Sequence, residues 1–442
     1  MQLFCPKRHS AVICYNCISK LPTEVVAIMY YDCIIIGGGA SALMLAARLD
    51  VRNMPGGGLI IEKTGKCGTK LLMSGGGRCN ITHGGSIKDF ISCYGDAGPR
   101  LRKCLYRHSN IDLASWLEEN GIQLADSKGE PVYSWDLEDA GRVFPASHKA
   151  SDILYLLLEK AGSNGWEIRT DTEVHGIRQT DDGWEVSVSP SAVLTAENVV
   201  IASGGITFPE TGSDGSVFRI LEDLEVSVTP PRSALAPVYP EDYPYGELSG
   251  ITLEDVTVTV FESGESRADS TAGRQTEDAG QQTASPAPGG HGKMAARMTG
   301  DLLFTHRGFS GPVILNISRY AEPGGTLSVS YGKAMEDLPK RMQKVLESRS
   351  KGPSGDIRTS VLAGLLISDD FIISSVDDNG MVTAGGISLD EIDTSTMQLK
   401  RFPGLYAIGE AIDADGITGG YNLQMCWSTA SATAETLIHK QD

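Results

Sequence analysis

A few glycines and one acid near the start of the chain have the chemistry of a nucleotide-binding turn. Gly37 and Gly39 occupy the first two positions of a G-x-G-x-x-G pattern, and Ala42 takes the third, where alanine is permitted. Glu62 follows 25 residues after Gly37. Backbone N–H groups at such a turn bind a pyrophosphate, and the carboxylate accepts hydrogen bonds from a ribose. The spacing therefore predicts dinucleotide binding, with a carboxylate that disfavours a 2′-phosphate.

The elements that must position these residues can be read around them. The run YDCIIIGGGASALMLAARL, which starts at Tyr31, predicts a buried strand, a tight turn and a helix over about 40–49. LIIEK at 59–63 predicts the next strand and completes a βαβ unit. Further strands are predicted at about 166–170, 173–179, 184–189 and 197–202. The pattern indicates an α/β fold.

Glycine is concentrated elsewhere in the chain too, and it accounts for 51 of the 442 residues. Most of its doublets and triplets follow an apolar, strand-like run, where glycine lets the backbone approach a ligand closely. These clusters are Gly37–Gly39, Gly56–Gly58, Gly75–Gly77, Gly204–Gly205, Gly385–Gly386 and Gly419–Gly420. Several segments of the chain are therefore expected to contact one ligand.

The overall charge excludes some classes of partner. The chain has 38 basic and 56 acidic side chains, a formal net charge of −18 at pH 7. Nucleic acid is therefore not expected as a partner, because binding a duplex needs clustered Lys and Arg. No apolar run is long enough for a membrane span, and nine scattered cysteines suit reduced thiols. We expect a cytoplasmic protein that acts on a small molecule and does not bind a membrane.

Five longer motifs resemble one known family. They are KLLMSGGGRCNIT at 70–82, GRVFPASHKASDIL at 141–154, DLLFTHRGFSGPVILNIS at 301–318, VTAGGISLDEI at 382–392 and GLYAIGEAIDADGITGGYNLQMCWSTA at 404–430. From about Tyr31 to Ala434, the sequence resembles the HI0933-like, or BaiN-like, family of NAD(P)/FAD-dependent oxidoreductases. The resemblance implies a flavoprotein with FAD as its cofactor.

The resemblance also implies how the chain is organised: a Rossmann-type FAD-binding domain, interrupted by an inserted β-rich domain with a short helical segment. The two parts of the FAD-binding domain are expected at 29–205 and 376–442, and the insertion at 206–375. Within the insertion, 262–293 has almost no large apolar residue and predicts a disordered loop.

The resemblance implies which residues contact FAD. Gly37, Gly39 and Ser41 would face the pyrophosphate, Glu62 the adenosine ribose, and the backbone of Val174 the adenine edge. The other implied contacts are Gly76, Gly77, Arg78, Cys79 and Asn80 between ribityl chain and flavin, Gly409 and Glu410 at the ribityl hydroxyls, and Gly420, Tyr421, Asn422 and Leu423 under the flavin pyrimidine. A helix that begins after two glycines also suits the negative charge of a reduced flavin.

The first 28 residues precede the point at which the resemblance begins. Cys5, His9, Cys14 and Cys17 are potential zinc ligands, but only the last two have a recognised spacing. We therefore interpret residues 1–28 as an N-terminal extension that is either unstructured or not translated, and we predict no metal site.

The sequence assigns no catalytic acid or base. Four residues in or near the motifs are candidate proton donors: His83, His148, His306 and Tyr421. Arg78 would lower the pKa of the adjacent Cys79, although we favour a packing role for this cysteine. We expect the segment 301–312 to line the substrate pocket.

Three functions remain open at this point. No second G-x-G-x-x-G pattern follows a strand, so a nicotinamide would have to bind directly against the flavin. The first function is a reductase that passes hydride from NAD(P)H through the flavin to an unsaturated carbonyl compound. The second is an oxidase of a small amine, and the third is a flavin-binding sensor without turnover. The sequence leaves the oligomeric state open.

Overall fold

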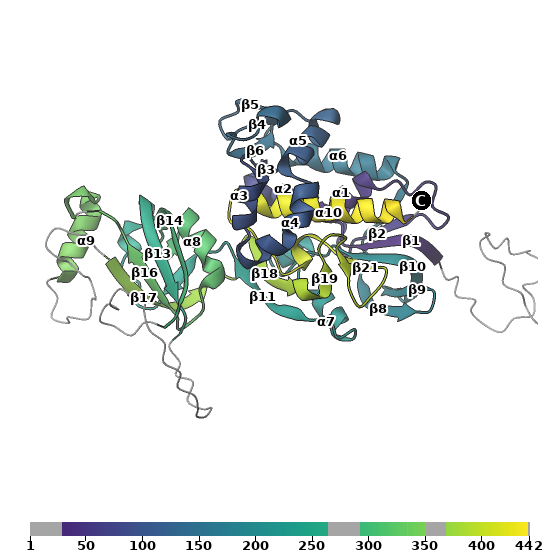
Figure 1. Cartoon of the computed structure of the whole chain (residues 1–442). Helices are drawn as coiled ribbons and strands as arrows, with labels where there is room; N and C mark the ends of the chain where they lie inside the picture. The colour runs from purple at the N-terminus through teal and green to yellow at the C-terminus, as the bar shows by residue number, and fades with distance from the viewer. Residues whose placement is uncertain (1–28, 264–291, 334, 351–367, 441–442) are drawn as a thin grey trace, which may run out of the picture.

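A mostly parallel sheet forms the centre of the larger part of the molecule (Figure 1). The computed structural model describes residues 29–263, 292–333, 335–350 and 368–440. The main path of this sheet runs β19 (Ile392–Asp393), β20 (Gln398–Leu399), β21 (Leu405–Ala407), β10 (Ala192–Ile201), β1 (Met29–Ile36), β2 (Gly58–Ile61) and β7 (Trp166–Arg169). From β21 to β7 all neighbours are parallel. β8 (Val174–Thr180) and β9 (Gly183–Val188) extend it from β10.

Helices cover this sheet because its central strands are apolar on both faces. β2 is buried at all four positions, as expected for a parallel strand between two layers. On one side, α1 (Ala40–Arg48) packs between α6 (Ala150–Ser163) and α10 (Tyr421–His439) (Figure 1). α4 (Gly98–Arg107) packs against α10 and α3 (Ile87–Ser92), and α2 (Thr69–Met73) packs against α6. A small sheet of β3 (Thr82–His83), β6 (Arg142–Pro145), β4 (Leu124–Ala125) and β5 (Pro131–Val132) contacts α10 through β3 and α6 through β6. α5 (Asn110–Glu119) precedes β4 in the chain.

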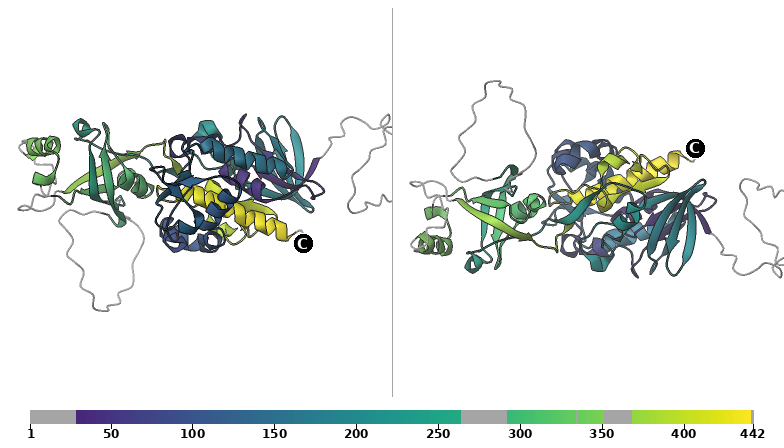
Figure 2. Two further views of the ribbon diagram at one scale, coloured as in Figure 1. Left: turned by 90° about the horizontal axis from the view of Figure 1, so that it is seen from above. Right: turned by 90° about the horizontal axis from the view of Figure 1, so that it is seen from below.

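A closed barrel forms a separate lobe at one end of the molecule (Figure 2). Its strands are β12 (Val238–Pro240), β15 (Phe309–Ser310), β14 (Met294–Phe304), β13 (Thr252–Phe261), β16 (Thr326–Ser330) and β17 (Ser368–Val376), with α8 (Pro312–Ile317) and α9 (Lys340–Ser350) beside them. Val256, Val258 and Val260 alternate into a core that also contains Phe304 and Phe309. The barrel therefore has its own hydrophobic core.

Two antiparallel strands join the lobes. β11 (Val228–Ala234) leads towards the barrel, and β18 (Val382–Ile387) returns from it. Leu235 and Val382 form a small buried cluster here, with Leu315 of α8 packed against it. α7 (Ser216–Glu222) precedes this ribbon and belongs to the core of the larger lobe.

The predicted α/β fold class is confirmed. The helix predicted at 40–49 is α1, and the four strands predicted between 166 and 202 are β7 to β10. The domain boundaries at 205 and 376 stay predictions. Residues 1–28, with the four potential zinc ligands, and residues 264–291 of the predicted disordered loop lie outside the described residues.

A buried ion pair connects the barrel lobe to the loop that precedes α10. Arg319, which follows α8, donates from Nη2 to Oδ1 of Asp415 at 2.6 Å, and their side chains are only 12% and 4% exposed. Oδ2 of Asp415 is buried and has no hydrogen-bond partner. Burial raises the pKa of Asp415 from 3.8 to about 6, against the opposing effect of Arg319.

This shift predicts a pH-dependent stability. Because its folded-state pKa is raised, Asp415 binds more protons in the folded protein between pH 3.8 and about 6. The protonation of Asp415 therefore adds to the free energy of unfolding in full at low pH. This contribution, on the order of a few kcal/mol, is lost as pH rises through this window. Urea unfolding at a series of pH values should show that, as pH rises through this window, the free energy of unfolding falls less for Asp415→Asn than for the wild type. Identical pH slopes would contradict this assignment.

Candidate active site

One cavity of about 730 Å³ collects most of the residues that the sequence associates with FAD. It is lined by Gly37, Gly39, Ser41, Glu62, Gly76, Arg78, Asn80, Val174, Glu410, Gly420, Asn422 and Leu423. Four predicted residues do not line it: Gly77, Cys79, Gly409 and Tyr421. The volume lies within the range of ligand-binding pockets.

The N-terminus of α1 faces this cavity. Gly39 is the residue before the helix, and no side chain caps the free N–H groups of the first turn. A Cβ on Gly39 would have one neighbour within 4 Å, the carbonyl oxygen of Ala202 at 3.9 Å. A Cβ on Gly37 would lie 2.6 Å from the same oxygen, and its φ is +100°. Gly37 is thus required by the turn itself, whereas Gly39 leaves space for an anion at a helix N-terminus.

Glu62 is held rigidly at the end of β2. Its side chain is buried, and Oε2 accepts a hydrogen bond from the backbone N–H of Gly38 at 2.8 Å. Oε1 accepts hydrogen bonds from the backbone N–H and the hydroxyl of Thr64, both at 2.8 Å. These bonds compensate for burial of the charge and fix the carboxylate beside the glycine turn.

The glycine triplet forms a loop that side chains could not easily adopt. Gly75, Gly76 and Gly77 have φ values of +57°, +66° and +85°. A Cβ on Gly76 would meet nothing within 4 Å. Nearby, Oδ1 of Asn80 is buried without a hydrogen-bond partner. The loop therefore presents backbone and one unsatisfied acceptor to the cavity.

Cys79 faces the protein core and not the cavity. It is fully buried, and burial raises the pKa of its thiol to about 12. The guanidinium of Arg78 lies over the ring of Phe144, 5.1 Å from its centroid. The predicted lowering of the Cys79 pKa by Arg78 is therefore wrong, because desolvation dominates. The observations support the packing role.

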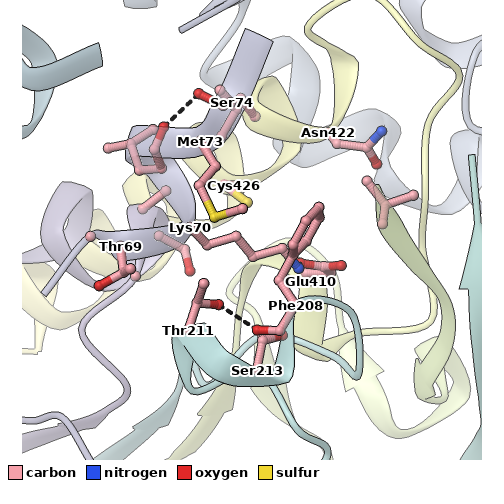
Figure 3. A pocket seen from close by; sticks show the side chains of 18 of the residues that line it. Thr69, Lys70, Met73, Ser74, Phe208, Thr211, Ser213, Glu410, Asn422 and Cys426 are labelled. Atoms are coloured by element: carbon pink, nitrogen blue, oxygen red, sulfur yellow. Dashed lines mark hydrogen bonds and ion pairs between the residues drawn. The ribbon is translucent and has the colours of Figure 1, made fainter. Parts of the chain in front are cut away.

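Lys70 and Glu410 form an ion pair in the cavity wall, and sequence analysis missed the lysine (Figure 3). Nζ of Lys70 lies 2.6 Å from Oε2 of Glu410. Oε1 of Glu410 accepts hydrogen bonds from Thr207 Oγ1 at 3.1 Å and from the backbone N–H of Thr383 at 2.7 Å. The signal available in the sequence was a charge at the start of KLLM, an otherwise apolar run.

The start of α10 forms another wall. Gly420 has a φ of +99°, and a Cβ there would lie 2.5 Å from the carbonyl oxygen of Thr82. Asn422 ties down the preceding loop through two 2.8 Å hydrogen bonds to the backbone of Gly416. Tyr421 instead stacks on His83, with their ring centroids 5.2 Å apart. Burial raises the pKa of Tyr421, consistent with a packing role.

The four candidate proton donors do not line the cavity. Besides Tyr421 and its neighbour His83, His148 stacks on Phe144 and His306 is exposed on the barrel lobe. Within 301–312, predicted to line the pocket, Pro312 alone does so. The side chains of Leu302, Phe304 and Phe309 point into the barrel core instead.

Several lining residues carried no sequence signal. Phe208 has a φ of +58°, unusual for an aromatic residue, and its ring lies 5.7 Å from Nζ of Lys70 (Figure 3). Oγ of Ser213 is buried and has no hydrogen-bond partner. The apolar part of the wall includes Phe208, Leu235, Leu315, Met381, Val382 and Ile417.

These features fit FAD. The open space at Gly39 before an uncapped helix suits a pyrophosphate, and the unpartnered Asn80 and Ser213 oxygens suit the polar groups of a nucleotide. The described residues contain no cluster of three or more potential metal ligands. The comparisons with known proteins agree with this chemistry.

Residues 31–436 match the family described as HI0933-like protein Rossmann domain. The chain belongs to the HI0933-like family. It is similar to a ribosomal RNA dihydrouridine synthase of Escherichia coli, with 28% identity over 92% of this chain and 98% of the relative. It is also similar to a 3-dehydro-bile acid delta(4,6)-reductase of Clostridium scindens, with 23% identity over 89% of this chain and 96% of the relative.

Membership in the HI0933-like family makes this protein an FAD-dependent oxidoreductase. Among solved structures, a 3-ketosteroid delta1-dehydrogenase from Sterolibacterium denitrificans matches with a TM-score of 0.48 and 12% identity, over 93% of this chain and 100% of that chain. In the part of the chain that the structure describes, no helix has the length and apolar character needed to cross a membrane.

The different environments of the two fingerprint glycines lead to a prediction. Gly39→Val should fold, but its side chain would occupy the space before α1, and we expect FAD affinity to fall about tenfold or more, or ~1.4 kcal/mol. Gly162→Val is the matched control, because this exposed glycine of α6 also has open space around it. Fluorescence titration of the apoprotein with FAD measures both. Equal affinity in the two variants would place the pyrophosphate elsewhere.

Proposed function

We propose that the protein is a reductase that passes hydride from NAD(P)H through FAD to a carbon–carbon double bond conjugated to a carbonyl group. The observation that carries this proposal is that one cavity is shared. The candidate cofactor residues on α1, β2 and α10 and the apolar wall between the two lobes line the same space. A nicotinamide and a substrate would therefore use that space in turn.

The names of the two relatives support the choice of reaction. A delta(4,6)-reductase of a 3-dehydro-bile acid and a dihydrouridine synthase both add hydrogen to a ring double bond. In both named substrates the ring also carries a carbonyl group. The substrate of this chain is proposed at that level of chemistry: a ring with a polarised double bond.

The residues of the chain have separable roles in this proposal. When bound, FAD supplies the hydride acceptor and donor. The N-terminus of α1 and Glu62 would hold its nucleotide end, and the helix that begins at Tyr421 would stabilise negative charge near the flavin pyrimidine. Phe208, Leu235 and Leu315 would exclude water from the reacting faces.

Two of the sequence predictions belong to this proposal. NAD(P)H is the proposed reductant, and it would bind directly against the flavin, because FAD occupies the one Rossmann fingerprint of the sequence in our assignment. A small molecule remains the proposed substrate, given the net charge of −18. Free uridine tests the chemistry suggested by the dihydrouridine synthase relatives without assuming that RNA binds.

A shared cavity predicts ping-pong kinetics. Anaerobic mixing of the FAD-loaded protein with NADPH or NADH should bleach the flavin, and either 2-cyclohexen-1-one or uridine should restore its colour. Steady-state rates over a grid of both substrates should then give parallel double-reciprocal lines, since oxidised nicotinamide must leave before the second substrate enters.

Three outcomes would contradict the proposal. Intersecting lines would exclude alternate use of one space. Flavin that is bleached by aminoacetone but by neither nicotinamide, with hydrogen peroxide formed in air, would favour the amine oxidase. A flavin that none of these compounds reduces would favour the sensor.

A further inference from the structure

Two arginines line the cavity together with Phe144. Arg142 and Phe144 are two residues apart in β6, so their side chains point to the same face of the strand. Arg78 approaches from the glycine loop, with its guanidinium carbon 5.1 Å from the centroid of the Phe144 ring. Arg78, Arg142 and Phe144 all line the cavity. The ring of Phe144 thus contacts the guanidinium of Arg78, and Arg142 extends from the same face of β6.

Neither arginine has an acidic partner among the described residues. The side-chain hydrogen bond of Arg78 is a long one, from Nε to the carbonyl oxygen of Gly75 at 3.3 Å. Both side chains are exposed at the cavity edge. By contrast, Arg319 and Arg401 each form an ion pair with a carboxylate, as expected in a chain with an excess of acid.

The charge of the cavity is opposite in sign to that of the chain. Five basic side chains line the cavity, against three acidic ones. Two of the basic groups are already neutralised, since Lys63 pairs with Asp214 and Lys70 with Glu410. The other three, Lys66, Arg78 and Arg142, form no ion pair with a carboxylate among the described residues. An anion bound in this part of the cavity would be attracted by this uncompensated charge.

We propose that Arg142, together with the guanidinium of Arg78, binds a carboxylate or phosphate group of the substrate, which leaves the backbone of Arg78 for the flavin contact that the family resemblance implies. This proposal rests on the reductase function and narrows its substrate to anionic compounds. A guanidinium is planar and presents paired N–H donors that match both anions. The ring of the substrate would face the apolar wall at Phe208 and Leu235, with its anionic group at the Phe144 edge.

Binding to the FAD-loaded protein tests the proposal without turnover. Each of two probe pairs compares an anion with a neutral partner. In trans-cinnamate and cinnamamide a carboxylate is replaced by an amide, and uridine 5′-monophosphate differs from uridine by one phosphate. Flavin difference spectra give the dissociation constant of each. We expect at least one anion to bind about tenfold more tightly than its neutral partner. The pair with the larger ratio identifies the preferred anion, carboxylate or phosphate.

Variants of Arg142 connect this preference to the site. Arg142→Gln should abolish the preference for the anion, and Arg142→Lys should keep part of it, because charge remains while paired hydrogen bonding is lost. Arg102→Gln is the matched control, since Arg102 is exposed on α4 and does not line the cavity. FAD content and bleaching by NADPH, measured in the same samples, report separately on the reductase function.

The proposal is overturned if neither anion binds more tightly than its neutral partner. It is equally overturned if Arg142→Gln retains FAD and the full preference. If Arg142→Gln loses FAD, the FAD-loaded Arg142→Lys variant provides the test. A weaker preference for the anion than in the Arg102→Gln control supports the site. An unchanged preference overturns the proposal.

Discussion

The carboxylate of Glu410 joins the segments on which the cavity depends. It lies after β21, yet its partners come from α2, from the loop after β10 and from the first residues of β18. Its side chain is 16% exposed, and a charge so far removed from water is stable only with its hydrogen bonds satisfied. Lys70, Thr207 and Thr383 are distant in sequence. Satisfying the hydrogen bonds of Glu410 therefore brings α2, the loop after β10 and β18 together in one wall of the cavity.

The rest of the cavity is built largely from backbone. α1 and α10 both begin directly after a glycine, and the loop at Gly75–Gly77 follows left-handed conformations. Glycine permits these turns and leaves N–H groups accessible, whereas side chains would fill the space. The polar contacts of such a site are therefore less dependent on side-chain identity. The apolar and cationic edge depends instead on its side chains, and specificity for the substrate would arise there.

The sequence was informative wherever local rules determine the structure. An apolar run followed by glycines predicted the turn between β1 and α1, and short apolar runs separated by turn residues predicted β7 to β10. It was less informative where tertiary packing decides. Cys79 and Tyr421 belong to strong motifs, yet both face the core. Lys70 and Arg142 gain their significance from partners, or the lack of them, that only the folded chain reveals.

A crystal structure of the FAD-loaded protein would test the central claim of this account most directly. The claim is that one cavity between the two lobes holds the cofactor and leaves room for the substrate. The account places the pyrophosphate at the N-terminus of α1, next to Gly39, and the flavin between the glycine loop and the start of α10. The ion pair of Lys70 and Glu410 should remain intact beside the ribityl chain. A pyrophosphate bound away from α1, or a flavin outside this cavity, would contradict the account.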